Sequence, residues 1–145
     1  MTKEDIYTQL DYNRGQLSYY ERRLRELKDK RDALESFSRQ CESRIISFEN
    51  SISRRKKRVA SFDGLTSTVK IAAQYAKKMN DMLTGRDFTN ATNSISELQF
   101  SVSRQMRDTA NEIIDVEDKI TYFGNKVSDF QYQYDTYSEG EVTNG

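Results

Sequence analysis

The chain has 145 residues, a length that suits one structural unit better than two cores of ordinary size. It carries 23 basic and 23 acidic side chains against only 30 Leu, Ile, Val and Phe, with no Pro and no Trp, which favours a helical assembly over a compact α/β enzyme. The absence of His excludes His-based catalysis and His metal ligands, and a single Cys cannot form an internal disulfide. We therefore expect a protein that is not an enzyme and holds no cofactor.

The N-terminal half shows the clearest pattern, a heptad repeat that continues through residue 62 without a slip. Of its 17 seam positions, 13 are apolar, as expected of a long helix that buries one narrow stripe. The a positions are Leu10, Leu17, Leu24, Arg31, Ser38, Ile45, Ile52 and Val59. The d positions are Ile6, Asn13, Tyr20, Leu27, Leu34, Cys41, Phe48, Arg55 and Phe62.

The sequence Phe62-Asp63-Gly64 interrupts this repeat, because Asp-Gly is a strong turn pair and Gly can adopt the positive φ that ends a helix. A second amphipathic segment follows over residues 65–84, and Gly85 is interpreted as its C-terminal cap or as a kink. A third segment is predicted for about residues 88–137. Residues 139–145 form a polar tail, which we expect to be disordered.

These segments predict an all-α fold, an elongated antiparallel helical hairpin or coiled coil with three helical segments, at about 3–61, 65–84 and 88–137, in one domain over residues 1–138. Residues 1–62 carry 15 basic and 10 acidic side chains, whereas residues 63–145 carry 8 and 13. Opposite net charges favour antiparallel pairing of the two halves.

Candidate sites for chemistry are few. Acidic residues such as Glu112 and Asp115 fall beside the seam, so we interpret them as a solvated helix face and expect no metal site. Cys41 occupies a seam position and is interpreted as a small buried hydrophobe. Arg31 and Arg55, also on the seam, are expected to set the register or extend towards solvent, with pairing to an acidic residue of a partner as the alternative.

The basic cluster Arg54-Arg55-Lys56-Lys57-Arg58 lies near the predicted end of the first helix, where the helix dipole favours positive charge. Solvation there, with contacts to the acidic second half, explains it without a ligand. An acidic protein, a nucleic acid or an anionic lipid surface remain alternatives. No second basic stripe or interleaved aromatic residues support a nucleic acid, so we expect none as a partner.

The predicted layout resembles the small WXG-type substrates of type VII secretion, in which an aromatic-x-Gly turn joins two amphipathic helices. Phe62-Asp63-Gly64 stands where those proteins have Trp-x-Gly, with Phe in place of Trp. The long first helix and the long segment after the turn are similar to the YwqH-like family, small helical proteins encoded beside LXG-domain toxins in Gram-positive bacteria. The secretion signal of that system, Tyr-x-x-x-Asp/Glu, is matched by Tyr137 and Glu141.

The resemblance implies a non-enzymatic targeting factor or chaperone that binds the helical LXG domain of a toxin for type VII secretion, beside a second small helical protein. It also implies a cytoplasmic protein and leaves open whether the protein is itself exported. The alternative is a self-assembling coiled-coil scaffold, such as a homodimer. Apolar residues off the seam offer surface for another helix, and these are Phe37, Ile46, Ile71, Phe100 and Ile114. The start of the chain lacks the apolar core of a secretory signal, and no run approaches 18 apolar residues, so no membrane span is expected.

Overall fold

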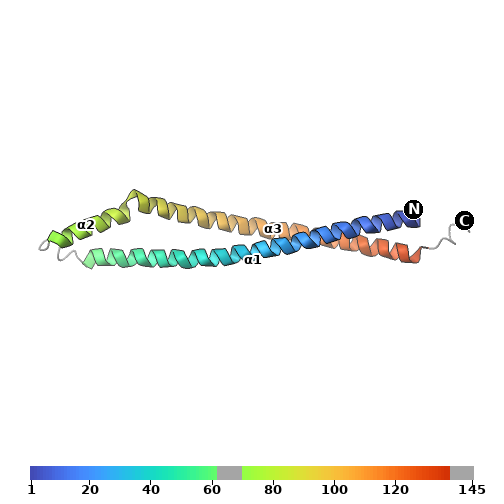
Figure 1. Ribbon diagram of the computed structural model, residues 1–145, viewed down its shortest axis with the longest axis horizontal. Helices are drawn as coiled ribbons and strands as arrows, with labels where there is room; N and C mark the ends of the chain where they lie inside the picture. The colour runs from blue at the N-terminus through green and yellow to red at the C-terminus, as the bar shows by residue number, and fades with distance from the viewer. Residues whose placement is uncertain (62–69, 138–145) are drawn as a thin grey trace, which may run out of the picture. The chain divides into compact units, whose positions relative to one another are not determined.

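A computed structural model describes residues 1–61 and 70–137, which form three helices and, within those ranges, no strand. Helix α1 spans Lys3–Ser61, α2 spans Lys70–Thr84 and α3 spans Arg86–Thr136 (Figure 1). The predicted all-α fold of antiparallel helices in three segments is confirmed. The turn motif Phe62-Asp63-Gly64 lies outside the described residues.

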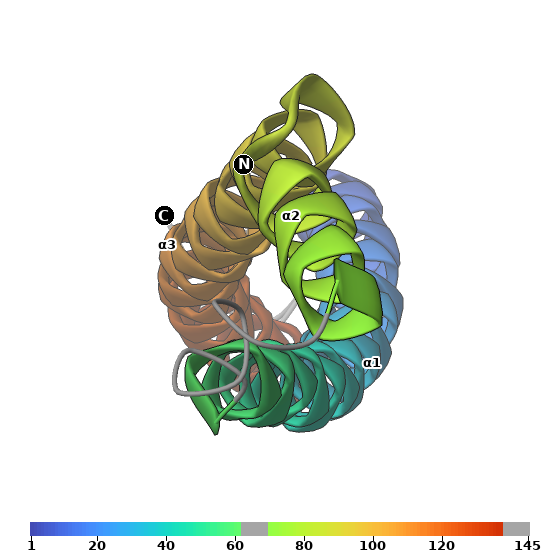
Figure 2. The ribbon, with the colours of Figure 1, turned by 90° about the vertical axis from the view of Figure 1, so that its left-hand side faces the viewer.

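The chain divides into two compact units. Unit 1 contains Met1–Asp32 and Arg107–Gly145, and unit 2 contains Ala33–Met106. In unit 1 the start of α1 runs antiparallel to the end of α3, so the rings of Tyr7 and Tyr134 lie 5.9 Å apart and Tyr20 stacks on Phe123 at 5.6 Å. In unit 2 the end of α1 lies beside α2 and the start of α3 (Figure 2).

Helix α1 begins with a reciprocal cap. The Thr2 N–H donates to Asp5 Oδ2 at 2.8 Å, and the Asp5 N–H donates to Thr2 Oγ1 at 3.1 Å. These bonds satisfy donors that the first turn leaves free. The backbone N–H of Thr2, then its side chain, holds the pKa of the Asp5 carboxyl below its ordinary value. The cap therefore explains why the helix starts at Lys3, as the sequence predicts.

The core of unit 1 follows the predicted seam. Its buried residues on α1 all occupy seam positions, and on α3 they are Thr109 and Ile113, the full set being Ile6, Leu10, Asn13, Leu27, Thr109 and Ile113. Leu10 and Leu27 are each only 1% exposed. Asn13 is buried at a d position, where its Nδ2 donates to the Gln9 carbonyl at 2.6 Å. A single polar residue on a seam specifies register at some cost in stability.

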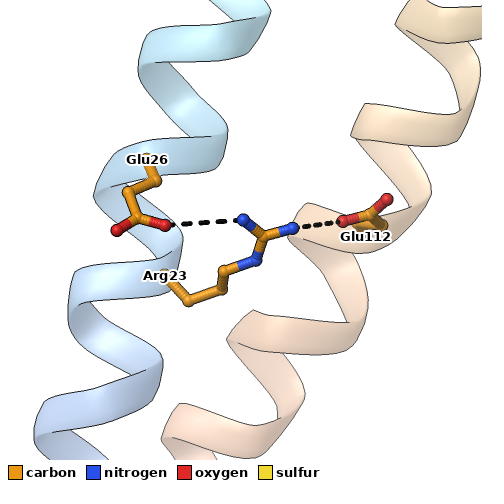
Figure 3. A network of polar contacts seen from close by, with 3 residues as sticks. All are labelled: Arg23, Glu26 and Glu112. Atoms are coloured by element: carbon orange, nitrogen blue, oxygen red, sulfur yellow. Dashed lines mark hydrogen bonds and ion pairs between the residues drawn. The ribbon is translucent and has the colours of Figure 1, made fainter.

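An ion-pair network joins the two helices of unit 1. Arg23 contacts Glu112 of α3 at 3.1 Å and Glu26 of its own helix at 3.4 Å (Figure 3). All three side chains are 43–59% exposed. Exposed pairs of this kind contribute about 0.2–1 kcal/mol each, less in salt. The network therefore helps to align the helices more than it stabilises them.

The seam of unit 2 is less well covered. No seam residue of α1 between Ala33 and Ser61 is buried, and in the described part of α2 and the start of α3 the buried residues are Leu83 and Val102. Phe48 stacks on Phe88 with ring centroids 6.2 Å apart, yet both rings remain half-exposed. The same heptad repeat thus closes a core in unit 1 and leaves it open in unit 2.

A bend at Gly85 separates α2 from α3 (Figure 1). Among the described residues no glycine has a positive φ, so Gly85 is a kink and not a left-handed cap. A Cβ built there would lie 2.7 Å from the Asp81 carbonyl oxygen, closer than any side chain tolerates. The Thr89 N–H donates to the Gly85 carbonyl at 3.1 Å, and this bond lets α3 begin at Arg86, two residues before the predicted start.

Candidate partner-binding groove

The open seam of unit 2 forms a groove along one side of α1. Three hollows of about 100, 410 and 250 Å³ follow one another, the first two sharing Gln99 and the last two sharing Lys56. On α1 they are lined by most of the a and d residues from Ser38 to Val59, by the b residues Ser53 and Ala60, and by the e residues Glu42, Glu49 and Lys56. We call this the e-side groove. Along α1 it runs from Ser38 to Ala60, about 33 Å at 1.5 Å per residue.

The floor of the e-side groove is mainly apolar. It consists of Cys41, Ile45, Phe48, Ile52 and Val59 of α1, with Leu83, Phe88, Ile95 and Val102 opposite. The seam is also open on its other side, where Arg44 and Leu98 border a smaller hollow of about 220 Å³. Unit 1 has an open hollow too, but it contains the buried amide of Asn13.

The two borders of the e-side groove differ in charge. Glu42, Glu49 and Lys56 stand at seven-residue intervals on the α1 border, all exposed. In the part of the chain that the structure describes, none of them forms an ion pair or side-chain hydrogen bond. The border across from them is uncharged and is made of Thr92, Ser96, Gln99 and Ser103. The groove therefore presents a row of two negative charges and one positive charge that are not paired by any residue within 1–61 and 70–137.

The five apolar residues predicted to contact a partner are exposed, by between 45% for Phe37 and 77% for Ile71. They do not form one patch. Phe37 and Ile46 are nine residues apart on α1, which at 100° per residue places them on opposite sides of the helix. Phe100 projects from a different helix, and Ile114 belongs to unit 1. Their role in binding stays a prediction.

The basic cluster Arg54–Arg58 is fully on the surface of α1. The predicted contacts between this cluster and the acidic second half of the chain are not made by any described residue. Only Lys56 of the cluster lines the e-side groove. By sequence, unit 2 carries 12 basic and 7 acidic residues, and unit 1 carries 11 basic and 16 acidic residues. Unit 2 therefore has a net positive charge and unit 1 a net negative charge.

The other predicted site residues are Cys41, Arg31, Arg55, Tyr137 and Glu141. Cys41 is a free thiol, but it is half-exposed in the groove wall and not buried as its seam position suggests. Arg55 is exposed and Arg31 contacts its neighbour Asp32 at 3.3 Å, so neither forms a buried pair. Tyr137 follows the end of α3 directly, and Glu141 lies outside the described residues.

Within residues 1–61 and 70–137, no three Cys, Asp or Glu side chains are grouped so that they could hold a metal ion. None of the helices in those ranges is both long enough and apolar enough to cross a membrane.

In comparisons with known proteins, no family model, no curated protein and no solved structure matches the chain.

The groove was missed from sequence because its floor residues were assigned to the buried seam. The sequence does contain a signal for it. Glu42, Glu49 and Lys56 recur at e positions, where a coiled coil normally places charges that face a partner helix. The segment of α3 opposite offers Ser, Thr and Gln in place of charges. Charges at e positions beside an exposed apolar seam are typical of a helix that packs against a further helix.

Proposed function

We propose that this protein is a non-enzymatic targeting factor or chaperone that binds the helical LXG domain of a toxin for type VII secretion. The observation that carries the proposal is the open seam of unit 2. Over three heptads of α1, from Ser38 to Ala60, none of the apolar side chains that line the groove is buried. Covering apolar surface contributes about 25 cal/mol per Å², so a further helix would find a favourable site.

Helical domains suit this surface better than small molecules do. The groove is shallow and follows the helix axis over about 33 Å, whereas small-molecule pockets are concave and enclose most of their ligand. A helix in a groove buries a stripe of matching length. An LXG domain is helical, and the resemblance of Phe62-Asp63-Gly64 to the turn of type VII substrates supports this particular partner.

Co-purification tests the proposal. The gene next to this one is read for an LXG toxin, and its LXG domain is co-expressed with the full chain, with and without the second small helical protein. We expect a stable complex by size-exclusion chromatography with light scattering, and a melting temperature above that of the free chain. If the chain does not bind the LXG domain and its melting temperature is the same in the presence of that domain, the proposal is wrong.

Export separates targeting from binding. Phe62→Ala is introduced, and binding to the LXG domain is measured beside secretion of the toxin. If the secretion machinery reads the aromatic residue, binding persists and export fails. Export that falls only in proportion to lost complex would instead assign Phe62 a folding role.

A self-assembling scaffold is the alternative function, because a second copy of unit 2 could also cover the open seam. Such a protein would dimerise on its own, and its melting temperature would rise with its concentration.

A further inference from the structure

We propose that the e-side groove of unit 2 binds one amphipathic helix of another protein, and that this helix carries a basic, a basic and an acidic residue at seven-residue intervals. The proposal deepens the proposed function, since it names the surface and the charge pattern of the partner. It rests on the groove itself and can be tested without the toxin.

The apolar floor sets the length of the partner helix. From Ser38 to Ala60 the groove spans three heptads, enough for sustained heptad pairing. At 1.5 Å per residue a helix of about 22 residues fills it. Its a and d side chains would cover Ile45, Phe48 and Ile52, which the hairpin leaves half-exposed. Such a helix would complete a three-helix bundle in unit 2.

The charged residues along the α1 border of the groove determine which charges the partner helix should carry. Glu42, Glu49 and Lys56 stand one heptad apart, about 10.5 Å, on the same side of α1. Residues at these positions of a coiled coil choose the partner and its orientation. They make no ion pair with the described residues of this chain, so a partner helix can supply their complement. The complement is Lys or Arg opposite each Glu, and Asp or Glu opposite Lys56.

A second copy of this chain fits the same border less well. An antiparallel copy centred on Glu49 would pair Glu42 with Lys56 at both ends but would oppose Glu49 to itself. A parallel copy in register would oppose like charges at all three positions. Like charges facing each other are destabilising, so the border favours a different protein.

The test uses two synthetic 22-residue helices with identical apolar a and d residues. One has Lys, Lys and Glu at the three flanking positions, and the other has Glu, Glu and Lys. Binding to the full-length protein is measured by fluorescence anisotropy at low salt, at concentrations where the peptides are monomeric. We expect the first peptide to bind at least about threefold more tightly, because all three of its charges can be matched, whereas the second peptide can match at most two of them by binding in the opposite direction; the preference should shrink in high salt.

A charge exchange on the protein provides the decisive variant. Glu42→Lys with Glu49→Lys and Lys56→Glu exchanges every charge of the border and alters only exposed side chains, so the fold should be retained, and circular dichroism checks this. The preference between the peptides should invert. The control is Glu97→Lys with Arg104→Glu, which exchanges two exposed charges one heptad apart on α3, outside the groove. It should leave the preference unchanged.

Each other outcome has a definite meaning. No preference between the peptides, or a preference that survives the exchange, overturns the proposal. A chain that is dimeric at micromolar concentration, remains dimeric after the exchange and excludes both peptides also overturns it, because the exchange preserves antiparallel self-pairing. If the peptides behave as expected but the LXG domain does not bind, the groove stands and the proposed function falls. If the LXG domain binds without competing with the first peptide, the proposed function stands and its assignment to this groove is wrong.

Discussion

Truncating one leucine in each unit measures how unevenly the hairpin is packed. Leu27 and Leu34 occupy consecutive d positions on α1, one in unit 1 and one in unit 2. Leu27 is 1% exposed and Leu34 is half-buried. Leu→Ala at a fully buried site costs about 2–5 kcal/mol, and a thin helix pair that can close around the gap should fall near 3 kcal/mol. At Leu34 up to about a third of the side chain is already in water, which lowers the expected cost to about 2 kcal/mol.

Urea denaturation followed by circular dichroism provides the comparison, at one protein concentration and with the slope against urea checked for equality. Both substitutions are Leu→Ala inside the same helix, so any gain in helix propensity cancels between them. We expect the free energy of unfolding to fall by about 1 kcal/mol more for Leu27→Ala than for Leu34→Ala. Equal losses, or a larger loss at Leu34, would refute the difference in packing between the units.

Four further substitutions test local features, the first three by the same assay. Gly85→Ala should destabilise the protein, because the new Cβ would lie 2.7 Å from a backbone carbonyl oxygen. Gly124→Ala should add about 0.5–1 kcal/mol of stability, because a Cβ there meets nothing within 4 Å. If both substitutions changed the stability in the same direction, the steric explanation would be wrong. Thr109→Val should add about 1 kcal/mol, since the Thr109 hydroxyl is buried without a hydrogen-bond partner among the described residues, and a loss would mean that the hydroxyl is bonded. Thr2→Ala should raise the pKa of Asp5 part of the way towards its ordinary value, as followed by NMR titration, because the Thr2 side chain is removed while its N–H, the larger cause, still donates to the carboxylate; an unchanged pKa would contradict the reciprocal cap. Because that pKa is lowered in the folded chain, the contribution of the cap is present above the ordinary pKa of Asp and is lost as the pH falls through the lowered value.

Periodicity predicted the helices well because a heptad repeat is a local property of the chain. The bounds of α1 were predicted at Lys3 and Ser61, and every α1 seam residue in unit 1 is buried or half-buried. The predicted start of α3 was two residues late, because Asp87 and the β-branched Thr89 have low helix propensity. In the structure the Thr89 N–H donates to the Gly85 carbonyl, and this bond forms the first turn of α3.

The degree of burial could not be predicted in the same way. Leu27 and Leu34 occupy the same seam position, yet only Leu27 is fully covered. Burial depends on how closely the opposite helix approaches and on which side chains it brings, and these are properties of residues that lie far away in sequence. The α3 segment opposite Ile45 and Ile52 supplies Thr92 and Ser96, which are too small and polar to cover an apolar seam. The groove can be recognised only when it is known which residues of α1 and α3 face each other.

Hydrogen exchange of the full chain, alone and with the co-purified LXG domain, tests most directly whether unit 2 is a helix pair that a partner completes. Exchange depends on local opening, which a bound helix suppresses where it docks. We predict that the complex slows amide exchange in residues 38–60 and 80–103, the two walls of the groove, and leaves residues 6–27 and 109–130 nearly unchanged. Protection confined to the latter ranges, or no added protection between residues 38 and 60, would contradict the account.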